Sequence, residues 1–266
     1  MLLEVSNLAI AYGDRPIVEG VSLNLDKGQV CAIVGESGSG KTTVIRAILG
    51  CLPGLGHVTG GTMFFDGKDL SKNTPEDWRK LSGMGMSMVF QDCGGTMDPI
   101  QRIRTQFVEY IQQHSDMTEE QAVERAIQML KRMSLPNPEV ILNSYPFELS
   151  GGMNQRVGVA MAMCFSPKLL LADEPTSALD VTTQAQVVKE MMNICREDGT
   201  AIIIVTHNLG VAAYMADHII VMQNGHVMEE GSSQQIVRNP QTEYTKKLLA
   251  AAPQIGDAAN EFHYDD

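Results

Sequence analysis

The chain has 266 residues, of which 44% are apolar and 20% charged, and its formal net charge is −12. This length allows one large domain or two closely joined lobes with a sizeable core. The acidic balance argues against a protein whose main partner is nucleic acid, because binding to a phosphate backbone depends on clustered Lys and Arg. We therefore expect any phosphate ligand to be captured by a local motif.

The five cysteines are scattered, without a CxxC pair or His at zinc-finger spacing, so we expect free thiols in a reducing compartment. The first residues contain no signal-peptide pattern. No apolar run reaches the roughly 18 residues that a membrane-spanning helix needs. Any work at a membrane is therefore expected to need partner chains.

Six short apolar or alternating runs predict β-strands. They are Leu2–Val5, Val30–Val34, Met84–Phe90, Leu169–Ala172, Ile202–Val205 and Ile219–Met222. The second, fourth and fifth runs are apolar throughout, which is typical of strands buried on both faces of a parallel sheet. The sequence thus predicts an α/β core.

Strand-like runs are missing between about residues 98 and 167, which predicts a helical subdomain inserted into the sheet domain. Thr118 and Gln121 form a capping-box pattern at the start of one helix. Its expected buried face is Ala122, Ala126, Met129, Leu130 and Met133. The ATPase domain is assigned to residues 1–253, and the acidic residues 254–266 are expected to form a loose tail.

A phosphate-binding motif follows the strand Val30–Val34 directly. The sequence from Gly35 to Thr42 is Gly-Glu-Ser-Gly-Ser-Gly-Lys-Thr, which fits G-x-x-x-x-G-K-[ST], and a helical stretch follows. Glycines allow backbone N–H groups to surround phosphate oxygens, and the helix start adds positive potential. We expect Lys41 to reach the β and γ phosphates of ATP and the Thr42 hydroxyl to bind Mg²⁺. A Gly-rich turn without function is the simpler alternative, which Lys41, Thr42 and the preceding strand disfavour.

Two adjacent carboxylates, Asp173 and Glu174, follow the apolar run Leu169–Ala172. Asp173 is predicted to hold Mg²⁺ directly or through water, and Glu174 to orient or deprotonate the attacking water. A surface Asp-Glu pair would be the better interpretation in isolation. The phosphate-binding motif reverses that preference.

A second candidate anion site lies in the sequence Leu-Ser-Gly-Gly-Met-Asn-Gln-Arg, residues 149–156, with a Ser hydroxyl and Gly amides at the start of a helix. This sequence resembles the signature of ABC ATPases. The resemblance implies that Ser150, Gly151, Gly152 and Gln155 close on ATP held by a partner subunit. A complete site would then require a dimer.

Four further residues match elements of the same family in chain order. The resemblance implies that Tyr12 stacks on adenine and that Gln91 contacts Mg²⁺ and water. It also implies that Asp180 lies at the dimer seam and that His207 binds the γ-phosphate. Each would alone be an ordinary polar or packed residue, and only the set supports these roles.

The predicted site therefore has four groups of residues. The catalytic residues are Glu174, His207 and Gln91. The ATP-binding residues are Tyr12, Gly35, Glu36, Ser37, Gly38, Ser39, Gly40, Lys41, Thr42 and Thr43. The signature and seam residues are Ser150, Gly151, Gly152, Gln155 and Asp180, and the Mg²⁺ ligands are Thr42, Gln91 and Asp173.

The resemblance covers about Leu2 to Pro253 and favours the ATPases of peptide and nickel importers. It rests also on the run His207–Val211 and on Asn239-Pro240 followed by Tyr244-Thr245 and Leu248-Leu249. It implies a P-loop fold of the ABC type, with a mixed, mainly parallel sheet, an N-terminal antiparallel β portion and an inserted helical subdomain. The implied partners are a second, unlike ATPase, two transmembrane permease subunits and, indirectly, an extracytoplasmic substrate-binding protein. The implied location is the cytoplasmic face of the cell membrane.

Several alternatives stay open. The cargo is peptide or nickel, and an exporter ATPase, a soluble ABC protein or a non-catalytic subunit are the rival functions. The residues after Gln91 depart from the family pattern, so the coupling at this loop is open, and without the family's cysteine-rich extension no iron–sulfur cluster is expected. Met84, Met86 and Met88 alternate, which we interpret as core packing on one strand face rather than a thioether metal site.

Overall fold

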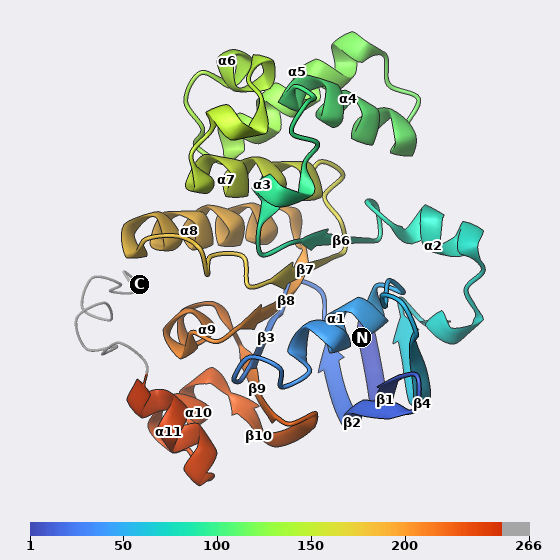
Figure 1. Ribbon diagram of the computed structural model, residues 1–266, viewed down its shortest axis with the longest axis vertical. Coiled ribbons are helices and arrows are strands. Elements are labelled where there is room, and N and C mark those ends of the chain that lie inside the picture. Colours follow the sequence, from blue (N-terminus) through green and yellow to red (C-terminus); the bar gives the residue numbers. More distant parts are fainter. Residues whose placement is uncertain (252–266) are drawn as a thin grey trace.

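The computed structural model describes residues 1–251, and the expected loose tail, residues 254–266, lies outside them. A small sheet near the N-terminus, a larger sheet in the middle and a group of helices make up the described chain (Figure 1). The helices between residues 93 and 162 gather at the end of the molecule farthest from the small sheet.

The larger sheet contains most of the predicted strands. Its members are β3 (Val30–Val34), β6 (Met86–Val89), β7 (Leu169–Asp173), β8 (Ala201–Thr206), β9 (His218–Gln223) and β10 (His226–Ser232). Their order is β10-β9-β3-β8-β7-β6, and all neighbours are parallel except the edge pair β10 and β9. Every residue of β3, β7 and β8 is buried, as their apolar sequences predict for strands covered on both faces. The expected α/β fold with a mixed sheet is confirmed.

The smaller sheet is antiparallel and lies at the N-terminal end. Its strands are β1 (Leu3–Tyr12), β2 (Arg15–Leu25), β4 (Gly56–Phe65) and β5 (Lys68–Asp69), in the order β2-β1-β4-β5. The predicted strand Leu2–Val5 is therefore only the first part of a longer one. Leu3, Val5 and Leu8 pack in a core shared with α1 (Lys41–Ile48) and with the larger sheet.

The predicted strand Met84–Phe90 is shorter than expected, because the chain turns before it. Gly83 has φ 81°, its N–H donates to the Met86 carbonyl at 2.8 Å, and the Gly85 N–H donates to the Leu81 carbonyl. Met84 sits on this turn and is 55% exposed, whereas Met86 is fully buried. The expectation that the alternating methionines share one buried face is therefore wrong for Met84.

Only helices, and no strand, lie in the described chain between β6 and β7. They are α3 (Cys93–Thr96), α4 (Ile103–His114), α5 (Glu119–Arg132), α6 (Pro138–Asn143) and α7 (Gly151–Ala162). The predicted capping box at Thr118 and Gln121 is confirmed at the start of α5. The five predicted core residues of this helix, Ala122 to Met133, are fully buried.

The remaining helices surround the two sheets. They are α2 (Pro75–Leu81), α8 (Val181–Asp198), α9 (Leu209–Met215), α10 (Ser233–Arg238) and α11 (Glu243–Ala251). In Figure 1, α8 separates the middle helices from the larger sheet, and α10 and α11 lie beside β10. None of the helices in residues 1–251 combines the length and apolar character needed to cross a membrane.

All five cysteines lie in the described chain as free thiols. Cys51, just after α1, is exposed, and the other four are buried. Burial raises the pKa of Cys31, Cys164 and Cys195 to about 12 and that of Cys93 to about 11. The buried thiols therefore stay protonated at neutral pH.

Candidate nucleotide-binding site

The predicted phosphate loop connects the carboxyl end of β3 to α1 (Figure 1). Its first glycine lies against backbone, since a Cβ on Gly35 would come 2.1 Å from the carbonyl oxygen of Met222. Only glycine fits at that position. Glu36, Ser37 and Gly38 are exposed along the loop, and Thr42 and Thr43 are half-buried in the first turn of α1.

The start of α1 leaves hydrogen-bond donors available. Among the described residues no side chain caps this end, and its first turn contains no acidic residue. The first backbone N–H groups can therefore bind an anion. Ser39 lies beside them, 3% exposed, and its hydroxyl oxygen has no hydrogen-bond partner in residues 1–251. Buried polar atoms without partners are uncommon, and a phosphate oxygen would supply the missing one.

The Lys41 ammonium group is hydrogen-bonded to the backbone of the phosphate loop. Its Nζ donates hydrogen bonds of 2.8 Å to the carbonyl oxygens of Gly35 and Glu36. Burial lowers the pKa of Lys41, and the negative charges of Glu174 and Asp173 oppose this effect. The ammonium group is thus bound by carbonyl oxygens that phosphate oxygens can replace.

Asp173, the last residue of β7, contacts the first turn of α1. Its Oδ1 accepts a hydrogen bond of 2.7 Å from the Thr42 hydroxyl. Burial raises the pKa of Asp173, while the hydrogen bond from Thr42 and the charge of Arg46 lower it. A hydroxyl and a carboxylate are hard oxygen donors of the kind that Mg²⁺ prefers, so this pair fits the predicted metal. Gln91, the third predicted ligand, is exposed just after β6, which neighbours β7 in the sheet.

Glu174 and His207 come together although 33 residues separate them. They follow β7 and β8, whose parallel register places Asp173 opposite Val205. The His207 Nδ1 lies 3.1 Å from Oε2 of Glu174. Glu174 has φ 44°, an unusual value for a non-glycine residue, and its N–H donates to the Val205 carbonyl at 2.8 Å. The backbone thus holds this carboxylate beside the exposed imidazole.

Asn208 is a structural residue of this site that the sequence interpretation did not identify. Its side chain accepts hydrogen bonds from the N–H groups of Gly210 and Val211 and so caps α9. Its own N–H donates to the Thr206 hydroxyl at 3.0 Å. These contacts fix the turn that contains His207. The signal was available, because Asn directly before a helical run is a typical N-cap.

Tyr12 ends β1 at the edge of the small sheet. It pairs with Gly56 of β4, and a Cβ on Gly56 would come 2.9 Å from the Tyr12 ring. The ring is half-buried, so part of it stays accessible. Its predicted stacking on adenine stays a prediction.

The predicted signature residues lie at the start of α7. Ser150 caps this helix, and both Ser150 and Gly151 are exposed. A Cβ on Gly152 would come 2.5 Å from the methyl group of Thr183 on α8. The carboxylate of Asp180, also exposed, accepts hydrogen bonds from the N–H and the hydroxyl of Thr183. The signature and the predicted seam residue therefore belong to two helix starts that touch each other.

The placement of Gln155 is a correction to the expected site. It lies on α7 like the other signature residues, but its side chain faces the core. It is 4% exposed, and its Nε2 donates a hydrogen bond of 3.1 Å to the carbonyl of Phe90. Its Oε1 accepts a longer one from the N–H of Cys93. The residue is one turn inside α7 on the side that faces the core, so it holds the backbone on both sides of Gln91 instead of facing a ligand.

The site thus consists of two parts on different elements. The helix after the phosphate loop, α1, packs on β1, β2, β4, β7 and β8, whereas α7 packs on α3, α5, α8 and β6. Lys41, Asp173 and Glu174 form the first part, and Ser150 with Gly151 forms the second. The chemistry of the first part suits a phosphate chain with a divalent cation, because it combines N–H donors, one ammonium and hard oxygen ligands.

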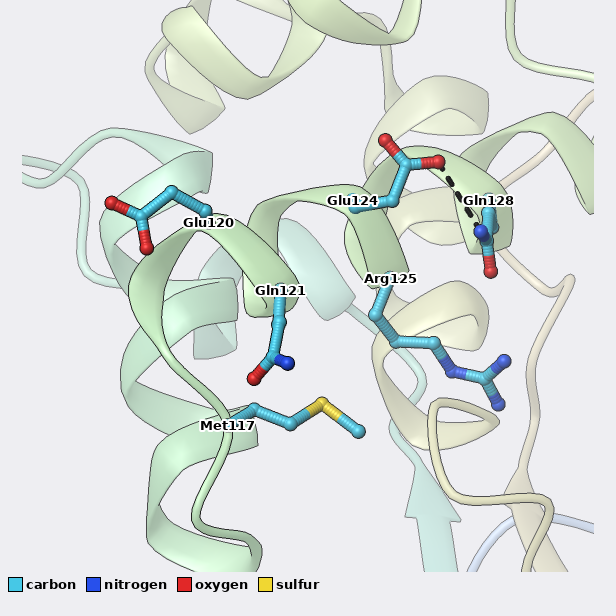
Figure 2. Close-up of a pocket in the computed structure, with 6 residues that line it drawn as sticks. All are labelled: Met117, Glu120, Gln121, Glu124, Arg125 and Gln128. Atoms are coloured by element: carbon cyan, nitrogen blue, oxygen red, sulfur yellow. Dashed lines mark hydrogen bonds between the residues drawn. The ribbon is translucent and has the colours of Figure 1, made fainter.

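Figure 2 shows an open hollow on α5 that contains none of these residues. It is lined by Met117, Glu120, Gln121, Glu124, Arg125 and Gln128. The only cationic side chain among them, Arg125, donates two hydrogen bonds to the Cys164 carbonyl. The Glu124 and Gln128 side chains are hydrogen-bonded to each other. The hollow therefore contributes no residue to the nucleotide site.

Comparison with protein families and curated proteins gives consistent results. The family model described as ABC transporter matches residues 18–177. The oligopeptide transport ATP-binding protein OppD of Bacillus subtilis is 40% identical over 98% of this chain and 74% of its own length. The dipeptide transport ATP-binding protein DppD of Escherichia coli is 38% identical over 96% of this chain and 79% of its own.

Solved structures show the same architecture. A dimeric ATP-binding cassette in a post-hydrolysis state with ADP and phosphate aligns with a TM-score of 0.77 at 28% identity, over 87% of this chain and 99% of that one. The cbiO1 protein of Clostridium perfringens, part of an ABC transporter complex, aligns with a TM-score of 0.78 at 27% identity. That alignment covers 97% of this chain and 98% of cbiO1.

Proposed function

Because this chain belongs to the ABC transporter family and is an ATPase of that family, we propose that it powers peptide import as one of two paired ATP-binding subunits. Each ATP lies between the phosphate loop of one subunit and the signature of the other. One observation carries the proposal. Lys41, the Thr42–Asp173 pair and the Glu174–His207 pair meet at the carboxyl ends of neighbouring strands.

Binding of the phosphates uses donors that the loop already provides. The N–H groups at the start of α1 and the buried Ser39 hydroxyl bind phosphate oxygens. Lys41 exchanges its carbonyl partners in the loop for the β and γ phosphates. Tyr12 stacks on the adenine.

The Mg²⁺ ion is held by Thr42 and by Asp173, directly or through water, with Gln91 as a further oxygen ligand. The ion neutralises charge on the phosphates when it is bound. Burial raises the pKa of Asp173 because it disfavours the charged carboxylate. A cation bound beside this carboxylate would favour its charged form, which is consistent with the role of metal ligand.

Hydrolysis depends on Glu174 and His207. The Glu174 carboxylate orients and deprotonates the attacking water, and His207 holds that carboxylate through Nδ1. The free edge of the imidazole is left to contact the γ-phosphate. Most of the catalysis is positioning and electrostatic stabilisation of charge on the transferred phosphoryl group.

The second subunit is needed because Ser150 and Gly151 are exposed at the start of α7. These donors bind the γ-phosphate of the partner's ATP, and Asp180 lies at the seam between the subunits. We expect the partner to be an unlike ATPase of the same family. The pairing is consistent with the dimeric cassette to which this chain is similar.

The permease contact is assigned to exposed apolar side chains on the helical side of the molecule. Ile100 is 83% exposed and Phe147 is 72% exposed, and Phe147 stacks on Tyr145 at 5.4 Å between ring centroids. We propose that a permease surface covers these exposed apolar side chains. They lie in the chain between Gln91 and the signature, so a permease bound there is linked to both parts of the site.

The cargo is proposed from the relatives, which are described as transporting oligopeptides and dipeptides. We therefore place peptide before nickel. Two transmembrane permeases and an extracytoplasmic substrate-binding protein complete the importer, and the chain acts at the cytoplasmic face of the membrane. An exporter ATPase and a soluble ABC protein are the rival assignments.

The proposal is tested by purifying the tagged full chain from its native cells and measuring ATP hydrolysis by the recovered assembly. Peptides, Ni²⁺ and the matching binding protein are added in separate arms. Two permeases, a second ATPase and stimulation by peptide support the proposal. Stimulation by Ni²⁺ alone assigns a nickel importer, and recovery of the chain alone or with ribosomes supports the soluble rival.

A further inference from the structure

The last helix of the described chain contacts the phosphate loop, a contact that the proposed mechanism does not use. In α11, the Tyr244 ring packs against the main core, as do Leu248 and Leu249. The Tyr244 hydroxyl instead faces the loop and accepts a hydrogen bond of 3.1 Å from the N–H of Glu36. The two residues are 208 positions apart in sequence. A C-terminal side chain therefore takes part in the structure of an N-terminal motif.

This hydrogen bond and the contact of Lys41 fall on the same peptide group. The carbonyl oxygen of Gly35 accepts from Lys41 Nζ at 2.8 Å, and the N–H of Glu36 belongs to the same amide. A trans peptide is planar, with its C=O and N–H pointing in opposite directions. Lys41 and Tyr244 thus contact the same planar group from opposite sides, so the orientation of that plane affects both hydrogen bonds.

The same hydroxyl also connects the loop to the larger sheet. It donates a longer hydrogen bond, 3.5 Å, to the carbonyl of Met222 in β9. That carbonyl is the atom against which Gly35 is packed. One hydroxyl of the last helix therefore contacts both the phosphate loop and the end of β9. It does so where Gly35 packs directly against the Met222 carbonyl.

The position of Tyr244 is fixed by an anchor at the start of α11. Glu229 of β10 accepts hydrogen bonds from the N–H groups of Gln241 and Thr242, at 2.7 and 3.0 Å, and from the Thr242 hydroxyl. Burial opposes the charge on Glu229, but the hydrogen bonds from Gln241, Thr245 and Thr242 outweigh it and lower its pKa to about 2. Thr245, next to Tyr244, is fully buried. These contacts fix the start of α11 and therefore the position of Tyr244 relative to the phosphate loop.

We propose that Tyr244 is a positioning residue of the phosphate loop, which orients the Gly35–Glu36 peptide and through it Lys41 for nucleotide binding. This inference rests on the proposed nucleotide site. It also gives a role to Tyr244-Thr245, part of the C-terminal sequence on which the family resemblance rests and which the proposed mechanism does not use.

The test is a comparison of MgATP affinity for the isolated full chain and for Tyr244→Phe, which removes only the hydroxyl and keeps the ring in the core. The dissociation constant is measured with a fluorescent ATP analogue. Loss of one hydrogen bond to the loop predicts a rise of about 2- to 10-fold. In the assembled transporter the same variant should raise KM for ATP and leave kcat unchanged, which a general loss of stability would not do.

Tyr110→Phe is the matched control, because it removes a hydroxyl from another half-buried tyrosine, on α4, whose ring packs against the same core. Wild-type affinity in Tyr244→Phe, or an equal loss in Tyr110→Phe, overturns the inference. Lys41→Ala separates this from failure of the proposed site. If Lys41→Ala abolishes binding and Tyr244→Phe does not change it, only the inference fails, whereas wild-type affinity in Lys41→Ala removes the proposed site itself.

A double-mutant cycle tests whether the anchor acts through the tyrosine. Glu229→Gln keeps the shape of the side chain and removes one acceptor oxygen, so it should also raise the dissociation constant. In the Tyr244→Phe background the same change should have little further effect, because the contact that it supports is already lost. If the fold increases in the dissociation constant of the two single variants multiply in the double variant, Glu229 does not act on the loop through Tyr244.

Discussion

The phosphate loop and the start of α7 both present helix N–H groups to an anion, but within residues 1–251 buried polar groups surround only the phosphate loop. Around the loop, Ser39 and Lys41 are buried, and Asp173 of β7 is hydrogen-bonded to the neighbouring Thr42. At α7, Ser150 and Gly151 are open to water. Because charges interact more strongly where water is excluded, we expect the first site to bind an anion alone and the second only after another surface covers it. In the proposed dimer, this difference places the dependence on the partner at the start of α7.

The largest effect is expected when hydrolysis is removed without touching either anion site. Glu174→Gln should lower the ATPase rate of the assembly by about 100-fold or more, because the base that activates water is lost. MgATP affinity should be kept, and the closed dimer should accumulate on size-exclusion chromatography. Glu76→Gln, which changes an exposed carboxylate paired with Lys80 on α2, is the control. Full turnover in Glu174→Gln would remove that residue from the role of base.

The next effect separates the two anion sites. Ser150→Ala should lower the ATPase rate of the assembly about 10-fold or more, because a donor to the transferred phosphate is lost. It should leave the MgATP affinity of the isolated chain unchanged. Ser232→Ala removes the equivalent cap of α10 and controls for the loss of a helix cap. Weaker binding to the isolated Ser150→Ala chain would show that both anion sites act within one subunit.

A smaller effect is expected at the connection between the two sites. Gln155→Leu removes the hydrogen bonds that hold the backbone around Gln91. It should lower the free energy of unfolding by about 1–3 kcal/mol and weaken cargo stimulation of the ATPase. MgATP affinity should not change. Gln112→Leu, on the exposed side of α4, is the matched variant, and equal cargo stimulation in both would show that Gln155 only stabilises the fold.

The smallest effect concerns pH. The pKa of Glu229 is lowered on folding from 4.5 to about 2, so its charge stabilises the folded chain fully above pH 4.5. That contribution is lost as the pH falls from 4.5 towards 2. The difference in unfolding free energy between wild type and Glu229→Gln should therefore be constant from pH 8 to 5 and shrink at lower pH. Urea titrations across this range measure it, and a gap that widens with acid would contradict the assignment.

Local motifs allowed the sequence to predict much of this structure. The phosphate loop and the capping box at Thr118 depend on residues a few positions apart, so their chemistry is visible in a short stretch. The buried parallel strands were also predicted, because a short run that is apolar throughout is typical of a strand covered on both faces. The turn at Gly83 was missed, since the alternation of methionines from Met84 onwards suggested a strand and obscured Gly83 before it and Gly85 within it.

Contacts between distant segments could not be obtained in this way. The pairing of Glu174 with His207 depends on the register of β7 against β8, which no short pattern specifies. The direction of Gln155 depends on which side of α7 faces the core. The contact of Tyr244 with Glu36 needs the last helix to be docked on β10. Each of these results from tertiary packing that brings together residues far apart in the chain.

The distribution of thiols has a practical consequence. Cys51 is exposed three residues after Ile48, the last residue of α1, whereas the other four cysteines are buried and protonated. A maleimide dye should therefore label the natural chain at one position without any engineered change. The dye would sit just beyond the end of α1 that is opposite Lys41, and the helix from Lys41 to Ile48 rises about 10 Å at about 1.5 Å per residue. Fluorescence from that end of α1 would then follow nucleotide arrival at the other end in real time.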